Sequence, residues 1–383
     1  MANTSQPSLD VKPRQSLRPN NFDVIRLAAA LQVVLFHGLE HLGIGQLEES
    51  WICQVLKCFP GVPIFFVISG FLVSASYQRS SSLKSYSINR FLRIYPGLWV
   101  CFLLSILSVL LLKPEVFQAT SIPKFGAWVL AQLTLFQFYN PEFLRDYGVG
   151  VLNGSLWTIP VELQFYVALP VFYWCFNRFS KHKNIVPLAG MIIVILLFLA
   201  INQTHSVGLA QFRGKAIWHK LLSASMFPHF WLFLVGVLIQ QHFQKIRWMF
   251  SGKFLIPWLL LHGVFVWLAT ELNAPTGTNT PFPLLGISLA GTTMAFAYTM
   301  PTIADKLLHH NDISYGVYIY HMVLVNALVH LGLVGQLRYL ALLFLATIVV
   351  AYLSWACVER PCMNLKKKWG NRGNVKPPSS DGQ

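Results

Sequence analysis

Charged side chains are scarce in this chain. Only 11% of its 383 residues are Asp, Glu, Lys or Arg, and 55% are hydrophobic. A soluble globular domain carries about 25% charged residues, so this composition excludes one. The sequence instead predicts an all-α fold, a polytopic helical bundle integral to a membrane. No internal repeat is visible, and no loop is long enough for a separate soluble domain.

Cysteines are also few. No pattern of Cys and His residues resembles a zinc site, so we expect no metal and no permanently bound cofactor. Cys53 and Cys58 fall in the first predicted outer loop, and the sequence leaves open whether they form a disulfide. Cys357 and Cys362 lie at the inner edge and are expected to stay reduced. The six cysteines are Cys53, Cys58, Cys101, Cys175, Cys357 and Cys362.

Ten apolar segments are long enough to cross a membrane as helices. The first lacks a small-residue cleavage site, so we expect a retained span rather than a removed signal peptide. A further apolar segment, Phe125–Tyr139, is too short for a full crossing and is predicted to be re-entrant or to lie along the outer surface. The predicted spans are Phe22–Leu42, Pro60–Tyr77, Ile94–Leu112, Trp157–Asn177, Ile185–Ile201, Trp218–Gln241, Phe254–Thr270, Leu284–Met300, Ile313–Leu331 and Leu337–Val358.

The net charge of +15 reflects membrane topology. With both termini in the cytoplasm, most of the 29 Lys and Arg residues fall in segments on the cytoplasmic side. This is the positive-inside bias, and it explains the charge without a nucleic-acid partner. The polar segments 1–20 and 366–383 are predicted to be disordered cytoplasmic tails on either side of a membrane domain at residues 21–365.

The first predicted span carries two ionisable side chains, Arg26 and His37. Such residues are costly to insert into a membrane, and they usually face a polar interior and have a function there. Eleven residues at about 100° each place both on one face of a helix, about 16 Å apart along its axis. A cation near one end and a potential base near the other predict a long ligand that is anchored at one depth and reacts at another.

Two polar clusters accompany the second and third predicted spans. Ser69 and Gly70 are small enough for a helix or a ligand to approach closely, and plain helix packing is the simpler interpretation. Arg90 and Arg93 share a helical face, and their guanidinium groups suit phosphate oxygens. Anchoring of the span at the inner surface is the alternative. Because Arg26 also lies near the inner end of its span, the three arginines are predicted to converge on one phosphate-bearing ligand.

Glu162 is the one carboxylate well inside a predicted span, so it requires a partner or a function. It lies at a similar predicted depth to His37, and a carboxylate beside a histidine would fix the tautomer of the ring and raise its basicity. A structural ion pair is the alternative. Trp157 and Tyr166 are predicted to line an acceptor pocket. His321 lies in the middle of its span and is predicted to be a substrate contact or a core histidine.

Together, these segments resemble the membrane-bound acyltransferase family 3, which includes O-antigen, exopolysaccharide and macrolide O-acyltransferases. The resemblance covers nearly the whole chain, and the motifs are weak singly but specific as an ordered set. Some members carry an appended extracytoplasmic esterase-like domain; we expect this chain to do the whole transfer itself or to hand over to a separate protein. The motifs are Arg26 with His37, Phe65–Phe71 (F-F-x-x-S-G-F), Arg90–Arg93 (R-x-x-R), Leu156–Glu162 (W-[ST]-x-x-x-E), Ser314–His321 (S-Y-x-x-Y-x-x-H) and Glu359–Pro361 (E-x-P).

The resemblance implies an acyl-CoA-dependent O-acetyltransferase in the bacterial inner membrane. The donor is expected to be acyl-CoA, most often acetyl-CoA, with its phosphates on Arg90 and Arg93 and with Arg26 and Ser69 along its path. The acceptor is expected to be a hydroxyl of an extracytoplasmic or lipid-linked surface-glycan sugar, as in O-antigen and other envelope polysaccharides. A macrolide-type antibiotic and peptidoglycan stay open, as do the acyl chain and the oligomeric state.

His37 is expected to be the general base, with Glu162 as its support, and a transient acyl-histidine is the competing mechanism. The alternative function is a multi-span transporter or flippase in which Arg26, His37 and Glu162 form a proton or substrate path. The sequence shows no pair of broken helices and no inverted halves, which favours the enzyme. A non-catalytic membrane scaffold explains a carboxylate within a span poorly.

Overall fold

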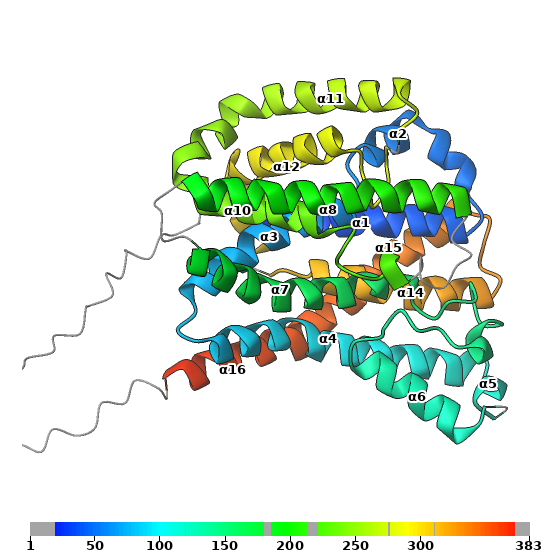
Figure 1. Ribbon diagram of the computed structural model, residues 1–383. Coiled ribbons are helices and arrows are strands. Elements are labelled where there is room, and N and C mark those ends of the chain that lie inside the picture. The colour runs from blue at the N-terminus through cyan, green and yellow to red at the C-terminus, as the bar shows by residue number, and fades with distance from the viewer. Residues whose placement is uncertain are drawn as a thin grey trace, which may run out of the picture.

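The computed structural model describes residues 20–118, 120–179, 185–212, 221–274, 276–309 and 311–371. Over these ranges every regular element is a helix and no strand occurs (Figure 1), which confirms the all-α prediction. The helices are α1 (Phe22–His41), α2 (Trp51–Lys57), α3 (Gly61–Arg79), α4 (Leu83–Leu112), α5 (Glu115–Gln118), α6 (Ile122–Leu133), α7 (Thr158–Phe179), α8 (Ile185–Phe212), α10 (Phe230–Ile246), α11 (Leu255–Glu271), α12 (Pro283–Tyr298), α13 (Ile303–Leu308), α14 (Ser314–His330), α15 (Leu337–Ser354) and α16 (Arg360–Asn371).

Six helical segments are long and apolar enough to cross a membrane, and they contain α1, α3, α4, α7, α11 and α15. Each coincides with a predicted span. The other four predicted spans overlap α8, α10, α12 and α14, of which the last three have 17, 16 and 17 residues. A bilayer crossing takes about 20. The described part of the chain therefore supports six of the ten predicted spans, and the other four stay a prediction.

The arginine motif lies on α4, as its helical spacing predicts, in the part of the helix that precedes the predicted span. α4 begins at Leu83, earlier than predicted, because the Ser82 hydroxyl accepts a hydrogen bond from a backbone N–H of the first turn at 3.1 Å and caps the helix. Its 30 residues extend for about 45 Å, more than the roughly 30 Å of a hydrocarbon core. Arg90 and Arg93 thus project from the part of α4 near its beginning, where the helix is longer than the membrane requires.

Three other boundaries also differ from or refine the prediction. The apolar segment 125–139 contains the end of α6, a helix of 12 residues that packs against α4 (Figure 1), so the expected short helix is confirmed. α10 begins only at Phe230, because Pro228 just before it lacks a backbone N–H and favours an extended neighbour. α16 continues to Asn371, into the predicted tail, where lysines favour a helix; residues 1–19 and 372–383 lie outside the described ranges.

α14 lies at the core of the bundle. It packs against α1, α4 and α15, and all ten residues of Ser314–Val323 are buried. α1 runs parallel to it, because Arg26 meets Asp312 just before α14 and His37 meets His321 further along. The two contacts keep α1 and α14 side by side over roughly 14 Å, at about 1.5 Å per residue. This pair of helices positions the candidate site.

Two glycines set the close contact between α3 and α10. A Cβ on Gly70 would lie 1.9 Å from the carbonyl oxygen of Phe233, and one on Gly236 would lie 2.2 Å from that of Val67. A larger residue at either position would force the helices apart. The close helix approach predicted for Gly70 is therefore confirmed, while the neighbouring Ser69 has a different place, described below.

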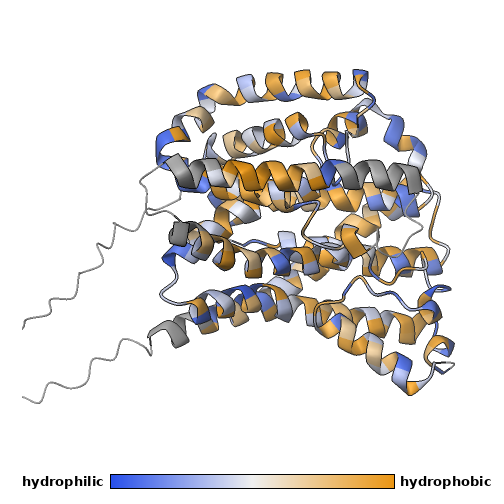
Figure 2. Ribbon diagram, viewed as in Figure 1, coloured by the Kyte–Doolittle hydropathy of each residue, from blue (hydrophilic) through white to orange (hydrophobic). Residues whose placement is uncertain are grey.

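Apolar side chains cover much of the outside of the bundle. Hydrophobic residues predominate along the helices, and hydrophilic residues gather near helix ends and in loops (Figure 2). On α11, Ile256, Leu260 and Trp267 are 67%, 66% and 62% exposed, and Leu345 on α15 is 63% exposed. Surfaces of this extent and composition require an apolar solvent, so the fold is that of a membrane protein.

Candidate active site

A cavity of about 440 Å³ lies between α1, α3, α4, α7 and the beginning of α14. This volume falls within the range of about 300–1,000 Å³ that is typical of small-molecule sites. Most of the residues predicted from the sequence to bind or act on substrates line it, although they come from four different helices. The predicted residues that the cavity brings together are Arg26, Ser69, Arg90, Arg93, Glu162 and Tyr166.

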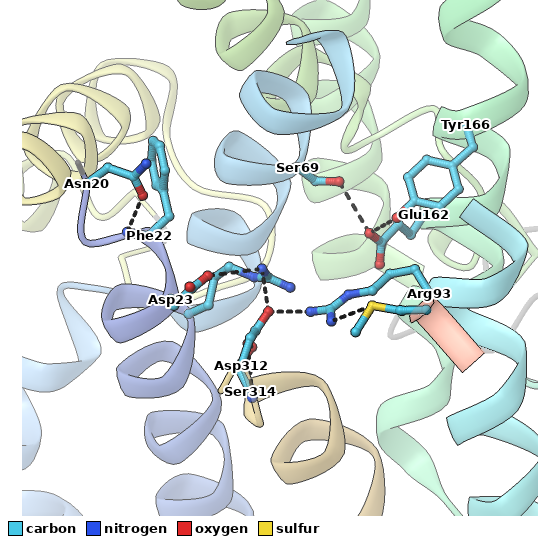
Figure 3. Close-up of polar contacts among 11 residues, drawn as sticks. Asn20, Phe22, Asp23, Ser69, Arg93, Glu162, Tyr166, Asp312 and Ser314 are labelled. Atoms are coloured by element: carbon cyan, nitrogen blue, oxygen red, sulfur yellow. Dashed lines mark hydrogen bonds and ion pairs between the residues drawn. The ribbon is translucent and has the colours of Figure 1, made fainter. Parts of the chain in front are cut away.

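Asp312 joins two of these arginines. Its Oδ2 accepts from Arg26 at 2.7 Å and from Arg93 in a still closer contact, while Arg26 also lies 3.8 Å from Asp23. The hydroxyl and the backbone N–H of Ser314 donate to Oδ1 (Figure 3). Burial would raise the pKa of Asp312, but the two guanidinium groups outweigh burial and hold the pKa well below its usual range. The ionised carboxylate therefore ties α1, α4 and α14 together.

Glu162 points toward Ser69 and Tyr166 (Figure 3). The Ser69 hydroxyl donates to Oε1 of Glu162 at 3.3 Å, and the Tyr166 hydroxyl, one turn along α7, donates to the same oxygen in a short contact. Within the described ranges, no hydrogen bond joins Glu162 to His37, so the expected pair is not formed. The two residues lie on helices with different neighbours, because α1 packs on α3 and α14, whereas α7 packs on α3, α4 and α8. An equal depth in the membrane therefore does not bring Glu162 next to His37.

The partner of His37 is His321. Nδ1 of His37 lies 2.8 Å from Nε2 of His321, and Nδ1 of His321 lies 2.7 Å from the carbonyl oxygen of Tyr318. A carbonyl oxygen only accepts, so Nδ1 of His321 carries the hydrogen, and with both rings neutral its Nε2 accepts from Nδ1–H of His37. This order assigns the free lone pair of His37 to Nε2. An imidazole in that form is a base or a nucleophile.

Tyr318 separates the large cavity from the histidine pair. It lines the cavity, while neither His37 nor His321 does. The ring centroid of Tyr318 lies 6.1 Å from that of His321 and 5.6 Å from that of Phe65. The Tyr318 hydroxyl accepts from Thr158 at 2.9 Å and donates to a backbone carbonyl at 3.1 Å. These two hydrogen bonds hold the Tyr318 ring in place, with the cavity on one side of it and His321 nearby.

Trp157 belongs to a second, smaller cavity of about 80 Å³. The two residues predicted to line one acceptor pocket therefore lie in different places, because Tyr166 lines the large cavity. The small cavity also contains the side-chain amides of Gln132, Gln137 and Asn140. The amide nitrogens already donate to backbone carbonyl oxygens, but Oε1 of Gln137 is buried without a hydrogen-bond partner in the described ranges. With the apolar face of the indole, the small cavity therefore suits a neutral ligand that donates a hydrogen bond.

Asp312 and Tyr318 are site residues that the sequence did not predict. Asp312 precedes Ser314 in an Asp-x-Ser pattern at the start of a predicted span, and it accepts a hydrogen bond from the backbone N–H two residues on, as in an Asx turn. Nothing in that pattern reports that two distant arginines share its carboxylate. Tyr318 lies inside the Ser314–His321 motif, but its position between the cavity and the histidines depends on packing.

The described residues contain no group of three or more His, Cys, Asp or Glu side chains that is arranged to hold a metal ion. Cys53 and Cys58, for which the sequence left a disulfide open, are free thiols in this structure. The polar side chains in and beside the large cavity are arginines, carboxylates, hydroxyls and the two imidazoles. Acid–base and phosphate-binding groups are what this set provides.

Membrane-type helices that enclose an arginine-lined cavity next to a base define a membrane enzyme better than a scaffold. Residues 20–358 match the family model described as an acyltransferase domain, Acyl_transf_3. The match covers more than half of the chain, and the chain belongs to acyltransferase family 3.

Similar proteins agree with this family. Nodulation protein 10 of Rhizobium leguminosarum bv. viciae is 34% identical over 361 residues, 91% of this chain and 94% of that protein. The O-acetyl transferase of Shigella phage Sf6 is 26% identical over 90% of this chain and 96% of its own length. The peptidoglycan O-acetyltransferase OatA of Listeria monocytogenes is 25% identical over 43% of this chain and 26% of its own. No solved structure matches. These relatives support an O-acyltransferase activity.

Proposed function

We propose that this protein transfers an acyl group, most often acetyl, from a cytoplasmic acyl-CoA to a hydroxyl of an envelope glycan. The observation that supports this best is the pair of contacts along α1, with Arg26 in the arginine-lined cavity and His37 in the histidine pair. Acyl-CoA is a long ligand with phosphates at one end and a reactive carbonyl at the other. The two contacts match its two ends, and the O-acetyltransferase relatives carry out such a transfer by name.

His37 is the general base of the proposed reaction. Its Nε2 takes the proton of the acceptor hydroxyl while the hydroxyl oxygen attacks the thioester carbonyl carbon. The new C–O bond forms the ester, the C–S bond breaks, and the proton passes from His37 to the departing CoA thiolate. His321 has the orienting role that the sequence assigned to Glu162, because its Nε2 holds the hydrogen of His37 on Nδ1.

The donor lies along the large cavity with its phosphates among the arginines. Ser69 and Glu162 lie in the same cavity and offer hydrogen-bonding groups for the amides of the pantetheine arm. Tyr318 closes the end near the histidines, so the acyl group reaches His37 when that ring moves aside. By the positive-inside rule, the arginine-rich end faces the cytoplasm, with both chain termini, and the acceptor approaches from the far side of the bacterial inner membrane.

The small cavity is the proposed contact for the acceptor sugar. Oε1 of Gln137 could accept from a sugar hydroxyl, and Trp157 offers an apolar face for a sugar ring. The name of the Listeria relative, a peptidoglycan O-acetyltransferase, supports a glycan acceptor. A lipid-linked sugar held at the outer leaflet would bring such a ring to the membrane depth of the site.

The test measures free CoA thiol released from acetyl-CoA by the full chain in detergent, and acetyl groups on envelope glycans by mass spectrometry in strains with and without the protein. We expect His37→Ala to lower both by about 10²–10⁴-fold, the usual contribution of a general base. His41→Ala is the matched control, since that ring lies on the same helix, 5.8 Å from His37, and should leave activity near normal. A transporter would leave acetyl-CoA intact, and an active His37→Ala variant would remove the assignment of the base.

A further inference from the structure

Two of the four arginines in the large cavity already form ion pairs within the protein. Arg26 and Arg93 share Oδ2 of Asp312, whose side chain is only 10% exposed. The other carboxylate oxygen accepts two hydrogen bonds from Ser314. A phosphate group placed between these arginines would meet the negative charge of a carboxylate that the fold holds in place, and like charges at close range repel. Arg93 is therefore poorly available to an incoming anion.

Arg79 and Arg90 line the same cavity, but neither forms an ion pair with a residue of the described ranges. Nε of Arg90 is buried and lacks a hydrogen-bond partner there. Its Nη2 donates to Ser76 at a long 3.4 Å, and the guanidinium lies 5.5 Å from the centre of the Tyr166 ring. The aromatic contact holds the guanidinium in place, while the unmade hydrogen bond leaves a donor that an anion would satisfy.

The charges of Arg79 and Arg90 act on each other. Arg90 lies close enough to Arg79 for its positive charge to act on that guanidinium. Glu162 lines the same cavity, but it accepts from Ser69 and Tyr166 and forms no ion pair with either arginine in the described structure. A phosphate group between the two guanidiniums would replace their repulsion with charge-assisted hydrogen bonds. Arg79 is also exposed, so this side of the cavity is accessible to a soluble donor.

We propose that Arg79 and Arg90, rather than Arg90 and Arg93, bind the phosphate groups of the donor. Arg93 instead forms the ion pair with Asp312 that ties α4 to α1 and α14. This inference rests on the proposed function, since it names the residues that would hold a phosphate-bearing thioester. Arg79 is the last residue of α3 and Arg90 lies on α4, so the site spans two helices. The assignment gives each arginine of the R-x-x-R motif a different task.

The test compares binding of CoA and of pantetheine, which lacks the phosphates, to the full chain in detergent by calorimetry. We expect Arg79→Gln and Arg90→Gln each to weaken CoA binding by about tenfold or more, the scale of one charge-assisted hydrogen bond, and to leave pantetheine binding unchanged. Arg79→Lys keeps the charge and should retain most of the affinity. Lys84→Gln removes a positive charge from an exposed residue of α4 outside the cavity and should have no effect.

The outcomes separate this inference from the proposed function. If the wild type transfers acetyl groups but Arg79→Gln binds CoA normally, Arg79 is not a phosphate ligand and the inference fails alone. Equal losses of CoA and pantetheine affinity would also refute it, because they would indicate a damaged cavity. If the wild type binds CoA through Arg79 yet transfers nothing, the proposed function fails and the binding site stands. A wild type that binds no CoA would overturn both.

Discussion

Replacing Asp312 with Asn tests whether one carboxylate holds three helices together. Arg26 and Arg93 bond the same oxygen, so their donor nitrogens lie no more than about two hydrogen-bond lengths apart, roughly 6 Å. Without the carboxylate, two positive charges at that separation repel by about 3 kcal/mol at an effective dielectric constant of about 20. The arginine side chains are 19% and 16% exposed. Screening by water therefore reduces the expected destabilisation to about 2 kcal/mol.

The measurement is thermal unfolding of the purified protein in detergent without ligand. A loss of about 2 kcal/mol should lower the apparent Tm by roughly 2–3 °C in a chain of 383 residues. Arg93→Gln alone leaves the pair of Arg26 and Asp312 intact, so its effect should be smaller. Adding Arg93→Gln to Asp312→Asn removes the repulsion, and the double variant should therefore be more stable than Asp312→Asn by itself. If Asp312→Asn simply disturbed the fold, a second substitution would not restore stability, so a restored Tm would indicate repulsion between the two arginines.

Two results would refute this account of the ion pairs that Asp312 forms with Arg26 and Arg93. One is an Asp312→Asn variant that melts with the wild type, which would show that the two arginines do not depend on the carboxylate. The other is a double variant whose loss equals the sum of the single losses, since residues that share a bond must couple. Asp146→Asn is the control for the substitution itself, because Asp146 is exposed and its side chain has no ion pair in the described ranges.

Two further substitutions test the histidine pair and the Tyr318 ring beside it. His321→Leu removes the acceptor for Nδ1–H of His37 and should lower kcat by about 10²-fold, with little change in the KM for acetyl-CoA. His321→Gln keeps an acceptor and should therefore recover part of the activity. Equal activities of the two variants would contradict the tautomer assignment. Tyr318→Ala should raise acetyl-CoA hydrolysis relative to transfer several-fold, because water then reaches the acyl group, while Tyr318→Phe keeps the ring and should not. The ratio of hydrolysis to transfer is measured from thiol release with and without acceptor. An unchanged ratio in Tyr318→Ala would show that the Tyr318 ring does not keep water from the acyl group.

The sequence predicts well what depends on one helix. Hydrophobic length locates the helices, and the spacing of Arg26 and His37 places both on one stripe of α1, with one contact near each end. The same reasoning places Arg90 and Arg93 on one face of a helix, and the structure brings both to the cavity. Each of these results requires only the helical repeat and the cost of charge in an apolar solvent.

Relations between helices are what the sequence does not contain. A matching depth suggested that Glu162 orients His37, but depth gives one coordinate of three, and the neighbour of α1 at that level is α14. The partner of His37 is His321, for which a core role seemed equally natural. The sequence also did not predict the ion pairs of Asp312, because its two arginine partners lie more than two hundred residues away in the chain.

The two contacts between α1 and α14 restrict how the site can open. Sliding one helix along the other would separate Arg26 from Asp312 and His37 from His321 together, because the helices are parallel and the contacts lie at both ends of the shared stretch. A hydrogen bond and a buried ion pair would then be lost in one step. Rotation of the Tyr318 side chain loses only two hydrogen bonds of its hydroxyl and leaves both contacts intact. In the proposed reaction, entry of the acyl group therefore requires only a movement of the Tyr318 side chain, and the distance from Arg26 to His37 stays constant while it happens.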